Sequence, residues 1–171
     1  MNNLLQKIPL INSTRRNHAL EHATLQVLEQ KYPGLRMAGV SFPLGFYLVG
    51  DMPTELVTEA VIEAQQRLGL EPELAIHPNC GTNLVTSSLL SGAATFLVLW
   101  GLSGKRKPTW ISLITSILVA VPVFILSRPL GPRIQQTVTT DLNLENWGVK
   151  LVESRKTRQG FVHFIHTGKQ S

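Results

Sequence analysis

The chain has 171 residues, of which 43% are hydrophobic, and its formal net charge is +5. This length allows one compact unit, or one small soluble domain together with a membrane segment. The basic residues have no interleaved aromatic residues and no nucleic-acid-binding motif beside them, so we expect no nucleic-acid partner. A single cysteine excludes an intramolecular disulfide framework.

The first 16 residues contain no long apolar stretch, and we expect them to form a leader that is not a cleavable signal peptide. Thr14 or Asn17 can cap a helix that runs to about Lys31 and ends at Tyr32-Pro33-Gly34. Leu20, Ala23 and Val27 lie on one side of this helix, and His18, Glu21, His22 and Glu29 project roughly opposite, with Leu25 among them.

Residues 36–50 predict a β-hairpin, because strand-forming residues surround the turn Pro43-Leu44-Gly45. Asp51 is expected to cap a second helix that begins with Pro53 and runs to about Leu68. The apolar set of that helix is Leu56, Ala60, Ile62, Ala64 and Leu68. Glu73–His77 is then expected to form a short strand with His77 at its end.

Two uncharged apolar runs, Leu84–Leu102 and Trp110–Ser127, follow in the sequence. A bilayer core needs about 20 apolar residues at 1.5 Å each, so these runs predict a transmembrane hairpin with a loop at Ser103–Pro108. The alternative is a buried helical hairpin inside a soluble protein. A chain this short is poorly suited to wrap two entirely apolar helices, which favours the membrane hairpin.

The surroundings of the two runs also indicate a lipid bilayer as partner. Small and polar residues in the first run suit close packing of helices in lipid. Basic residues cluster beside the runs, as is typical of positions near anionic lipid. The absence of an export signal favours a cytoplasmic soluble part, although the basic loop Lys105-Arg106-Lys107 favours the opposite orientation under the positive-inside rule.

After the apolar runs, Arg128–Arg133 predicts a rigid exit, residues 135–146 are polar, and two antiparallel strands are expected at Trp147–Ser154 and Gly160–His166. The predicted fold class is α+β, a small soluble domain interrupted by a two-helix transmembrane hairpin. Its expected parts are the leader (1–16), the soluble part (17–83), the hairpin (84–127) and a C-terminal segment (128–171) that packs on the soluble part.

The candidate chemistry begins in the first helix, with His18, Glu21 and His22. Side chains four residues apart lie on one face of a helix, so the two imidazoles can bind one metal ion. Glu21 lies on the same flank, where it can act as a general base and take a proton from a metal-bound water.

A second fragment, His77-Pro78-Asn79-Cys80, offers two more potential ligands. Together the fragments give His18, His22 and His77 as nitrogen ligands and Cys80 as a fourth, a set that suits a divalent metal such as zinc. Cys80 is alternatively a small buried thiol. His163 and His166 are an unsuitable ligand pair, because an offset of three places them on opposite faces of a strand.

Three ordered blocks carry a resemblance: His18-Ala-Leu-Glu-His22-Ala-Thr24, His77-Pro-Asn-Cys-Gly-Thr-Asn83 and Gln136-Thr-Val-Thr-Thr140. In this order they resemble a bacterial membrane family of unknown function, and are similar to a broader family of proposed metal-dependent membrane enzymes. The resemblance implies a shared metal site made of His18, Glu21, His22, His77 and Cys80, with Gln136, Thr139 and Thr140 near it. It also implies a bacterial plasma membrane or thylakoid membrane.

Two functions follow from these expectations. The first is a membrane-anchored, metal-dependent hydrolase in which Glu21 is the base. The alternative is a non-enzymatic membrane anchor or complex-assembly protein with a structural metal site, closed by Cys80. A chain that binds no metal is the third alternative. The sequence indicates neither a substrate nor a protein partner.

Overall fold

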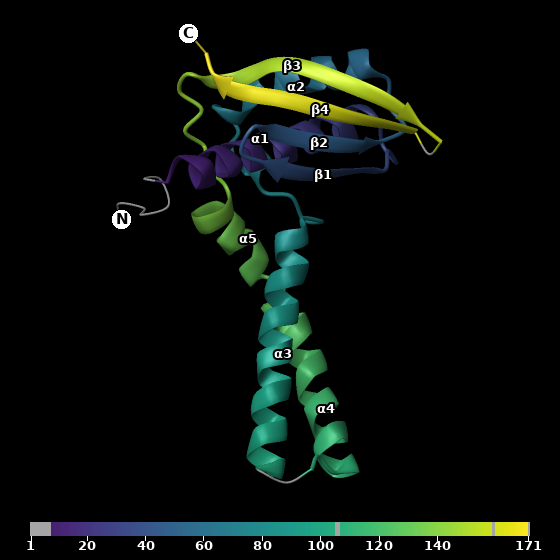
Figure 1. The fold of residues 1–171 in the computed structure, drawn as a ribbon, viewed down its shortest axis with the longest axis vertical. Coiled ribbons are helices and arrows are strands. Elements are labelled where there is room, and N and C mark those ends of the chain that lie inside the picture. The colour runs from purple at the N-terminus through teal and green to yellow at the C-terminus, as the bar shows by residue number, and fades with distance from the viewer. Residues whose placement is uncertain (1–7, 105–106, 159, 171) are drawn as a thin grey trace. The chain divides into compact units, whose positions relative to one another are not determined.

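The computed structural model describes residues 8–104, 107–158 and 160–170 (Figure 1). In these residues the fold is mixed, with five α-helices and a four-stranded antiparallel sheet. It divides into two compact units. The first contains the chain up to His77 and again from Gln135, and the second contains Pro78–Ile134.

Helix α1 spans Pro9–Lys31 and begins earlier than the sequence predicts. Pro9 occupies the first helical position, where its fixed φ and its missing N–H cost nothing. Thr14 and Asn17, the expected caps, lie inside the helix, so the expected leader is helical from Pro9 onward, while residues 1–7 lie outside the described residues. The C-terminal end at Lys31 is confirmed.

The sheet combines strands from both ends of the chain in the order β1-β2-β4-β3. Its strands are β1 (Met37–Phe42), β2 (Gly45–Gly50), β3 (Trp147–Thr157) and β4 (Gly160–Lys169). The predicted hairpin at residues 36–50 is confirmed, and the two C-terminal strands are present but longer than expected. Strand β4 pairs with β2, which brings the C-terminal strands back to the N-terminal half of the chain.

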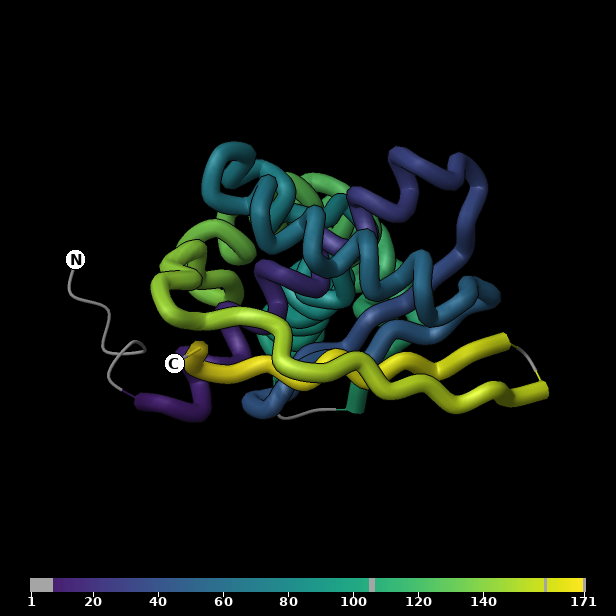
Figure 2. Tube along the Cα trace, turned by 90° about the horizontal axis from the view of Figure 1, so that it is seen from above, coloured from purple at the N-terminus to yellow at the C-terminus, as the bar shows by residue number. Residues whose placement is uncertain are grey.

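Helix α2 (Thr54–Leu68) lies with α1 on one face of the sheet (Figures 1 and 2). Pro53, and not Asp51, is its N-cap residue. The buried positions differ from those expected, because Val57 and Val61 face the core whereas Ile62 is 50% exposed. The buried residues of α2 are Val57, Ala60, Val61, Ala64 and Leu68.

The segment Pro72–Ala75 is a turn of 3-10 helix, where a strand ending at His77 was expected. The strand prediction is wrong because these residues satisfy their peptide groups locally. Leu74 N–H donates to Glu71 O over 3.1 Å and Ile76 N–H donates to Glu73 O over 3.0 Å.

The hydrophobic core of the first unit lies between the two helices and the sheet. Leu20 and Val27 of α1, Phe46 and Leu48 of β2, and Ile165 of β4 are fully buried. Glu21, His22 and Leu25, which the sequence places on the opposite side of α1, are buried as well. In β2 the buried positions alternate with exposed ones, as expected for a sheet covered on one face.

The second unit consists of three consecutive helices, α3 (Gly81–Ser103), α4 (Trp110–Ser127) and the short α5 (Leu130–Ile134). The expected rigid exit at residues 128–133 is thus largely helical. Ser91 Oγ donates to Ala120 O over 2.9 Å, which links the small, polar side of α3 to α4. The basic residues Lys105 and Arg106 of the predicted loop lie outside the described residues.

Helices α3 and α4 are long and apolar enough to cross a membrane, by length and composition. Only 6% of the apolar window of α3 and 17% of that of α4 is buried inside the protein. A buried hairpin in a soluble core requires mostly buried helices, so the described structure does not have the alternative arrangement that the sequence allowed.

Candidate functional site

The first unit brings three histidines together. His18 and His22 lie one turn apart on α1, and their ring centroids are 4.2 Å apart in an edge-on arrangement. The ring of His77, which follows the 3-10 turn, has its centroid 5.8 Å from that of His22. His22 and His77 are buried and His18 is half-buried. We refer to these three residues as the histidine cluster.

Backbone carbonyl groups fix the rings of the two α1 histidines. His18 Nδ1 lies 3.0 Å from Thr139 O, and His22 Nδ1 lies 2.7 Å from Ala75 O. A carbonyl oxygen only accepts, so each Nδ1 carries the proton and, in the neutral imidazole, Nε2 carries the lone pair. Histidines that bind metals are commonly held in this way by a hydrogen bond from the other ring nitrogen.

A glutamine from the far end of the first unit holds the backbone of His77. Gln135 is fully buried, its Oε1 accepts from His77 N over 2.9 Å, and its Nε2 donates to His77 O over 3.1 Å. His77 Nε2 also lies 3.4 Å from Glu29 Oε1 on α1. Gln135 therefore joins the segment after the apolar helices to the histidine cluster.

Glu21 lies on α1 beside His18, and its carboxylate faces the sheet. Ser41 Oγ of β1 donates a short hydrogen bond to Glu21 Oε2. Gly39 of β1 leaves the necessary space, because a Cβ at this glycine would lie 2.3 Å from Glu21 Oε1. The side chain is buried. Gly39 provides the space and Ser41 the hydrogen bond that together fix the position of this carboxylate.

Burial raises the pKa of the Glu21 carboxyl above its ordinary value. The hydrogen bond from Ser41 and the charge of His18 both lower this pKa, but burial has the larger effect. Glu21 is therefore a buried acid with a weakened tendency to ionise, a property shared with many general bases and general acids.

An apolar groove of about 550 Å³ runs along the N-terminal part of α1 to His18. Besides Arg15 and His18, it is lined by Leu10, Ile11, Thr14, Pro43, Val138 and Thr139. Pockets with apolar walls and few polar groups are the usual form of binding sites for small organic molecules. The groove gives one member of the histidine cluster a surrounding suited to an apolar ligand.

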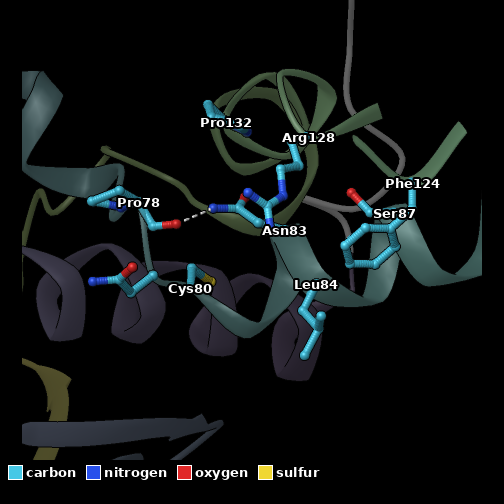
Figure 3. A pocket seen from close by; sticks show the side chains of 9 residues that line it. Pro78, Cys80, Asn83, Leu84, Ser87, Phe124, Arg128 and Pro132 are labelled. Atoms are coloured by element: carbon cyan, nitrogen blue, oxygen red, sulfur yellow. Dashed lines mark hydrogen bonds between the residues drawn. The ribbon is translucent and has the colours of Figure 1, made fainter. Parts of the chain in front are cut away.

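Cys80 belongs to the second unit, where it is the N-cap residue of α3. Its thiol accepts from Thr82 N over 3.4 Å and so caps the helix. Figure 3 shows Cys80 on the wall of a pocket formed by α3, the end of α4 and α5. A cap role accounts for the position of the thiol at the first turn, and its role as a metal ligand stays a prediction.

The third predicted block is only partly involved in the cluster. Thr139 contributes its backbone carbonyl to His18, and Thr140 Oγ1 donates to Gln135 O over 2.7 Å. Gln135, and not the neighbouring Gln136, bonds to His77. The sequence offers no signal for this choice, because residues Gln135–Thr139 form a turn of π-helix that rotates consecutive side chains in an unusual way.

Two buried polar residues of α1 that sequence reasoning missed support this region. Arg15 is 5% exposed and donates to Thr140 O over 2.8 Å. Asn17 is fully buried and bonds to three other segments of the first unit. Both lie one turn or less before His18, in a stretch whose residue types indicate only a polar helix start.

A divalent metal is chemically compatible with this set of groups. One ligand nitrogen of His18 lies within 4.8 Å of one of His22, and imidazole nitrogen is a common ligand of zinc. Three imidazoles with a carboxylate nearby are a donor set typical of zinc sites that keep a position open for water. Metal binding itself stays a prediction.

The fold and the cluster define a mixed α/β protein with two long apolar helices, and comparison with known proteins gives its family. The chain belongs to the DUF6391 family, described as a domain of unknown function, which matches residues 13–152. It is also 34% identical over 167 residues to an uncharacterised protein of Picosynechococcus sp., across 88% of this chain and 77% of that protein. No solved structure matches the chain.

These relatives are themselves uncharacterised, so they assign no reaction to the chain. The part of the resemblance that concerns a family of unknown function is confirmed. The relationship to metal-dependent membrane enzymes stays a prediction and depends on the chemistry of the histidine cluster alone.

Proposed function

We propose that this protein is an integral membrane protein with a zinc-like divalent metal centre, held by His18, His22 and His77, that serves a hydrolytic reaction. The membrane is the bacterial plasma membrane or the thylakoid membrane, and the first unit lies on its cytoplasmic side. The observation that carries the proposal is the arrangement of His18 and His22, whose Nδ1 atoms are both held by backbone carbonyls.

This arrangement supports metal binding because the two rings are already held in place, so less conformational entropy is lost when a metal binds. A neutral imidazole with Nδ1–H bonded to a carbonyl has its lone pair on Nε2, the nitrogen that then binds a metal. The two rings are one helical turn apart and already in edge contact. His22 and His77 are buried, and metals bind the neutral form of the imidazole.

A hydrolytic role is supported by the residues around the cluster. A bound divalent ion supplies Lewis acidity and a water of lowered pKa. Glu21, beside His18 on α1, is the chain's candidate for accepting a proton, and its buried carboxyl has a raised pKa. The apolar groove along α1 reaches His18 and provides a place for an apolar substrate to bind.

Membrane insertion is supported by the length, composition and exposure of α3 and α4. Their outward surfaces carry large apolar residues such as Leu97, Trp110 and Leu118, each more than 60% exposed. Exposed apolar surface of this extent is costly in water and favourable in lipid.

A structural metal site is a second candidate, and one observation favours it. The Glu21 carboxylate is already bonded to Ser41, an interaction that a proton acceptor would have to exchange for a water molecule. Cys80 follows His77 by three residues, and three extended residues span at most about 11 Å, so chain connectivity allows a fourth, thiolate ligand. Four protein ligands would close the site to water.

Cobalt substitution of the purified full chain separates the two candidates. The hydrolase predicts a site that keeps its visible cobalt spectrum in Cys80→Ala and whose bound water exchanges with azide, changing the spectrum. His18→Ala is expected to abolish the spectrum, and His166→Ala, which changes a histidine outside the cluster, is the matched control.

A thiolate-to-cobalt charge-transfer band that disappears in Cys80→Ala, without a response to azide, would contradict the hydrolase and support the structural site. A chain that acquires no cobalt spectrum at all would contradict both candidates. Glu21→Gln supplies a further test, because the hydrolase predicts an unchanged cobalt spectrum with a shifted pH dependence of azide binding.

A further inference from the structure

The second unit contains a pocket of about 410 Å³ where α3 begins and α4 ends (Figure 3). On one side it is lined by Cys80, the N-cap residue of α3, and by Asn83, Leu84 and Ser87 of α3, which follow the spacing i, i+3, i+4 and i+7 of a single helix face. Phe124 and Arg128, one turn apart, line the opposite wall. The pocket thus combines apolar walls with polar groups from two helices.

The electrostatics of this pocket favour an anion. Residues 78–134 contain no Asp or Glu, so the second unit has no carboxylate of its own to neutralise Arg128. Arg128 forms no ion pair among the described residues, and its guanidinium lies 5.7 Å from the centre of the Phe124 ring. The N-terminus of the 23-residue α3 adds the positive end of a helix dipole.

A second, independent observation points to a ligand. Ser87 is 1% exposed, and its hydroxyl has no hydrogen-bond partner among the described residues. Buried hydroxyl groups are normally paired, because an unpaired one loses its hydrogen bonds to water without a replacement. Figure 3 shows the Ser87 oxygen directed toward the side of the pocket on which Arg128 lies. A ligand oxygen in the pocket would supply the missing partner.

Asn83 has a fixed position at the same wall. Its Nδ2 donates to Pro78 O over 2.7 Å, the bond drawn as a dashed line in Figure 3. Gly131 of α5 makes this position accessible, because a Cβ there would lie 2.1 Å from Asn83 Oδ1. The pocket is therefore shaped by specific close contacts within the second unit.

We infer that this pocket binds the phosphate headgroup of an anionic membrane lipid. Arg128 pairs with the phosphate, the Ser87 hydroxyl donates to one of its oxygens, and Leu84 and Phe124 contact the glycerol and the first part of an acyl chain. Arginine is well suited to phosphate because its planar guanidinium can donate two parallel hydrogen bonds.

A lipid is favoured over a free phosphate ion by the pocket's position along the helices. The apolar wall residues Leu84 and Phe124 belong to the two helices that are long and apolar enough to cross a membrane. Arg128 immediately follows the last residue of α4, which is the level at which headgroups meet the hydrocarbon region. The inference rests on the membrane part of the proposed function and is independent of the metal centre.

The test uses the purified full chain in a zwitterionic detergent with fluorescently labelled phosphatidylglycerol or phosphatidylcholine as the probe, and measures binding by anisotropy. We expect tighter binding of phosphatidylglycerol, with a loss of about tenfold in Arg128→Gln, because the variant removes a charge-assisted hydrogen bond. Ser87→Ala is expected to lose about threefold. Lys107→Gln removes the same charge at the other end of α4 and is expected to bind normally.

Equal affinity for the two lipids, or an equal loss in Arg128→Gln and Lys107→Gln, would overturn the inference. Displacement of phosphatidylglycerol by an equal concentration of inorganic phosphate would overturn the assignment to a lipid. Circular dichroism confirms folding of each variant, and Ser87→Ala keeps the test decisive if Arg128→Gln does not fold. Alkaline carbonate extraction and metal content, measured on the same material, report separately on the two parts of the proposed function.

Discussion

Asn17 joins three separate segments of the first unit through its buried side chain. Its Nδ2 donates to Phe42 O of β1 over 2.7 Å, and its Oδ1 accepts from Trp147 Nε1 over 3.0 Å and from Thr167 Oγ1 over 2.6 Å. These contacts connect α1 to β1, β3 and β4, directly before His18. One polar side chain therefore fixes the position of α1 on the sheet, and α1 carries two of the cluster histidines.

Replacing Asn17 with alanine is expected to destabilise the first unit by about 2–4 kcal/mol, because it leaves buried donors of Trp147 and Thr167 unpaired. Thermal unfolding followed by circular dichroism in detergent measures the effect. Asn143→Ala removes an exposed asparagine and should change stability by less than about 0.5 kcal/mol. Equal melting temperatures for the two variants would contradict the role assigned to Asn17.

His163 makes the stability of the first unit dependent on pH. Burial lowers its pKa below the ordinary value of 6.5, although the hydrogen bond to Met52 O and the charge of Glu55 act in the other direction. The unfolded chain therefore takes up a proton at a higher pH than the folded chain does. Stability from this residue is complete above the unfolded pKa and is lost as the pH falls below it.

We accordingly expect the melting temperature to fall between about pH 7.5 and 5.5, with a smaller fall in His163→Gln. His166→Gln is the control, since this half-exposed residue lies on the opposite side of β4. The comparison concerns the slope with pH, so an overall loss of stability in His163→Gln does not affect it. A slope in His163→Gln as steep as that of the unmodified chain would show that His163 is not responsible.

At the scale of elements, α2 shows how the helical period determines which face of a helix is buried. Val57, Val61, Ala64 and Leu68 are buried and follow the spacing i, i+4, i+7 and i+11. Ile62 lies outside this spacing and is half exposed. Ile62 was expected among the apolar set of α2 because its side chain is large and apolar. The helical period, however, determines which face is buried.

Val61→Ala is expected to lower stability by about 2 kcal/mol, since it removes two buried methyl groups and leaves a cavity. Ile62→Ala deletes a larger side chain from an exposed position and should cost less than about 1 kcal/mol. Chemical denaturation of both variants measures the difference. A greater loss in Ile62→Ala would support the helix face that the sequence predicted.

Several elements were predictable because local chemistry and tertiary structure agree. The hairpin at residues 36–50 follows from strand-forming residues around Pro43-Leu44-Gly45, and α3 and α4 follow from uncharged apolar runs. The segment Glu73–His77 was not predictable in the same way, because a short apolar run forms a strand only beside a partner strand. In the structure it forms a 3-10 turn that still delivers His77 to the cluster.

The candidate site was predictable only in part. Helical spacing places His18 and His22 together, but the contact with His77 depends on how the chain turns after α2. The Ser41 contact of Glu21 and the Gln135 contact of His77 join residues far apart in the sequence. No local pattern encodes such contacts, because they arise only when the segments pack.

At the scale of the whole molecule, the first unit is assembled from both ends of the chain, and the second unit is inserted between them. Both ends must therefore come together for the sheet and the histidine cluster to form. The proposed membrane insertion is consistent with this requirement, because a helical hairpin returns a chain to the side of a membrane from which it entered.

Membrane insertion of α3 and α4 predicts that the full chain resists extraction by alkaline carbonate. Leu118 lies near the middle of α4 and is 68% exposed, so Leu118→Arg would place a charge in the hydrocarbon at a cost of about 3 kcal/mol. We expect this variant to lose carbonate resistance. Leu70→Arg, at an 85% exposed position of the first unit, is the control. Extraction of the unmodified chain would contradict membrane insertion.

The metal content of the purified full chain tests the central claim most directly. Elemental analysis after expression with zinc should find about one ion per chain, and His18→Gln/His22→Gln should lose it because a three-histidine site keeps only one ligand. His163→Gln/His166→Gln, with the same number of histidines replaced, should retain the ion. A metal-free unmodified chain, or equal metal content in the two double variants, would contradict the account.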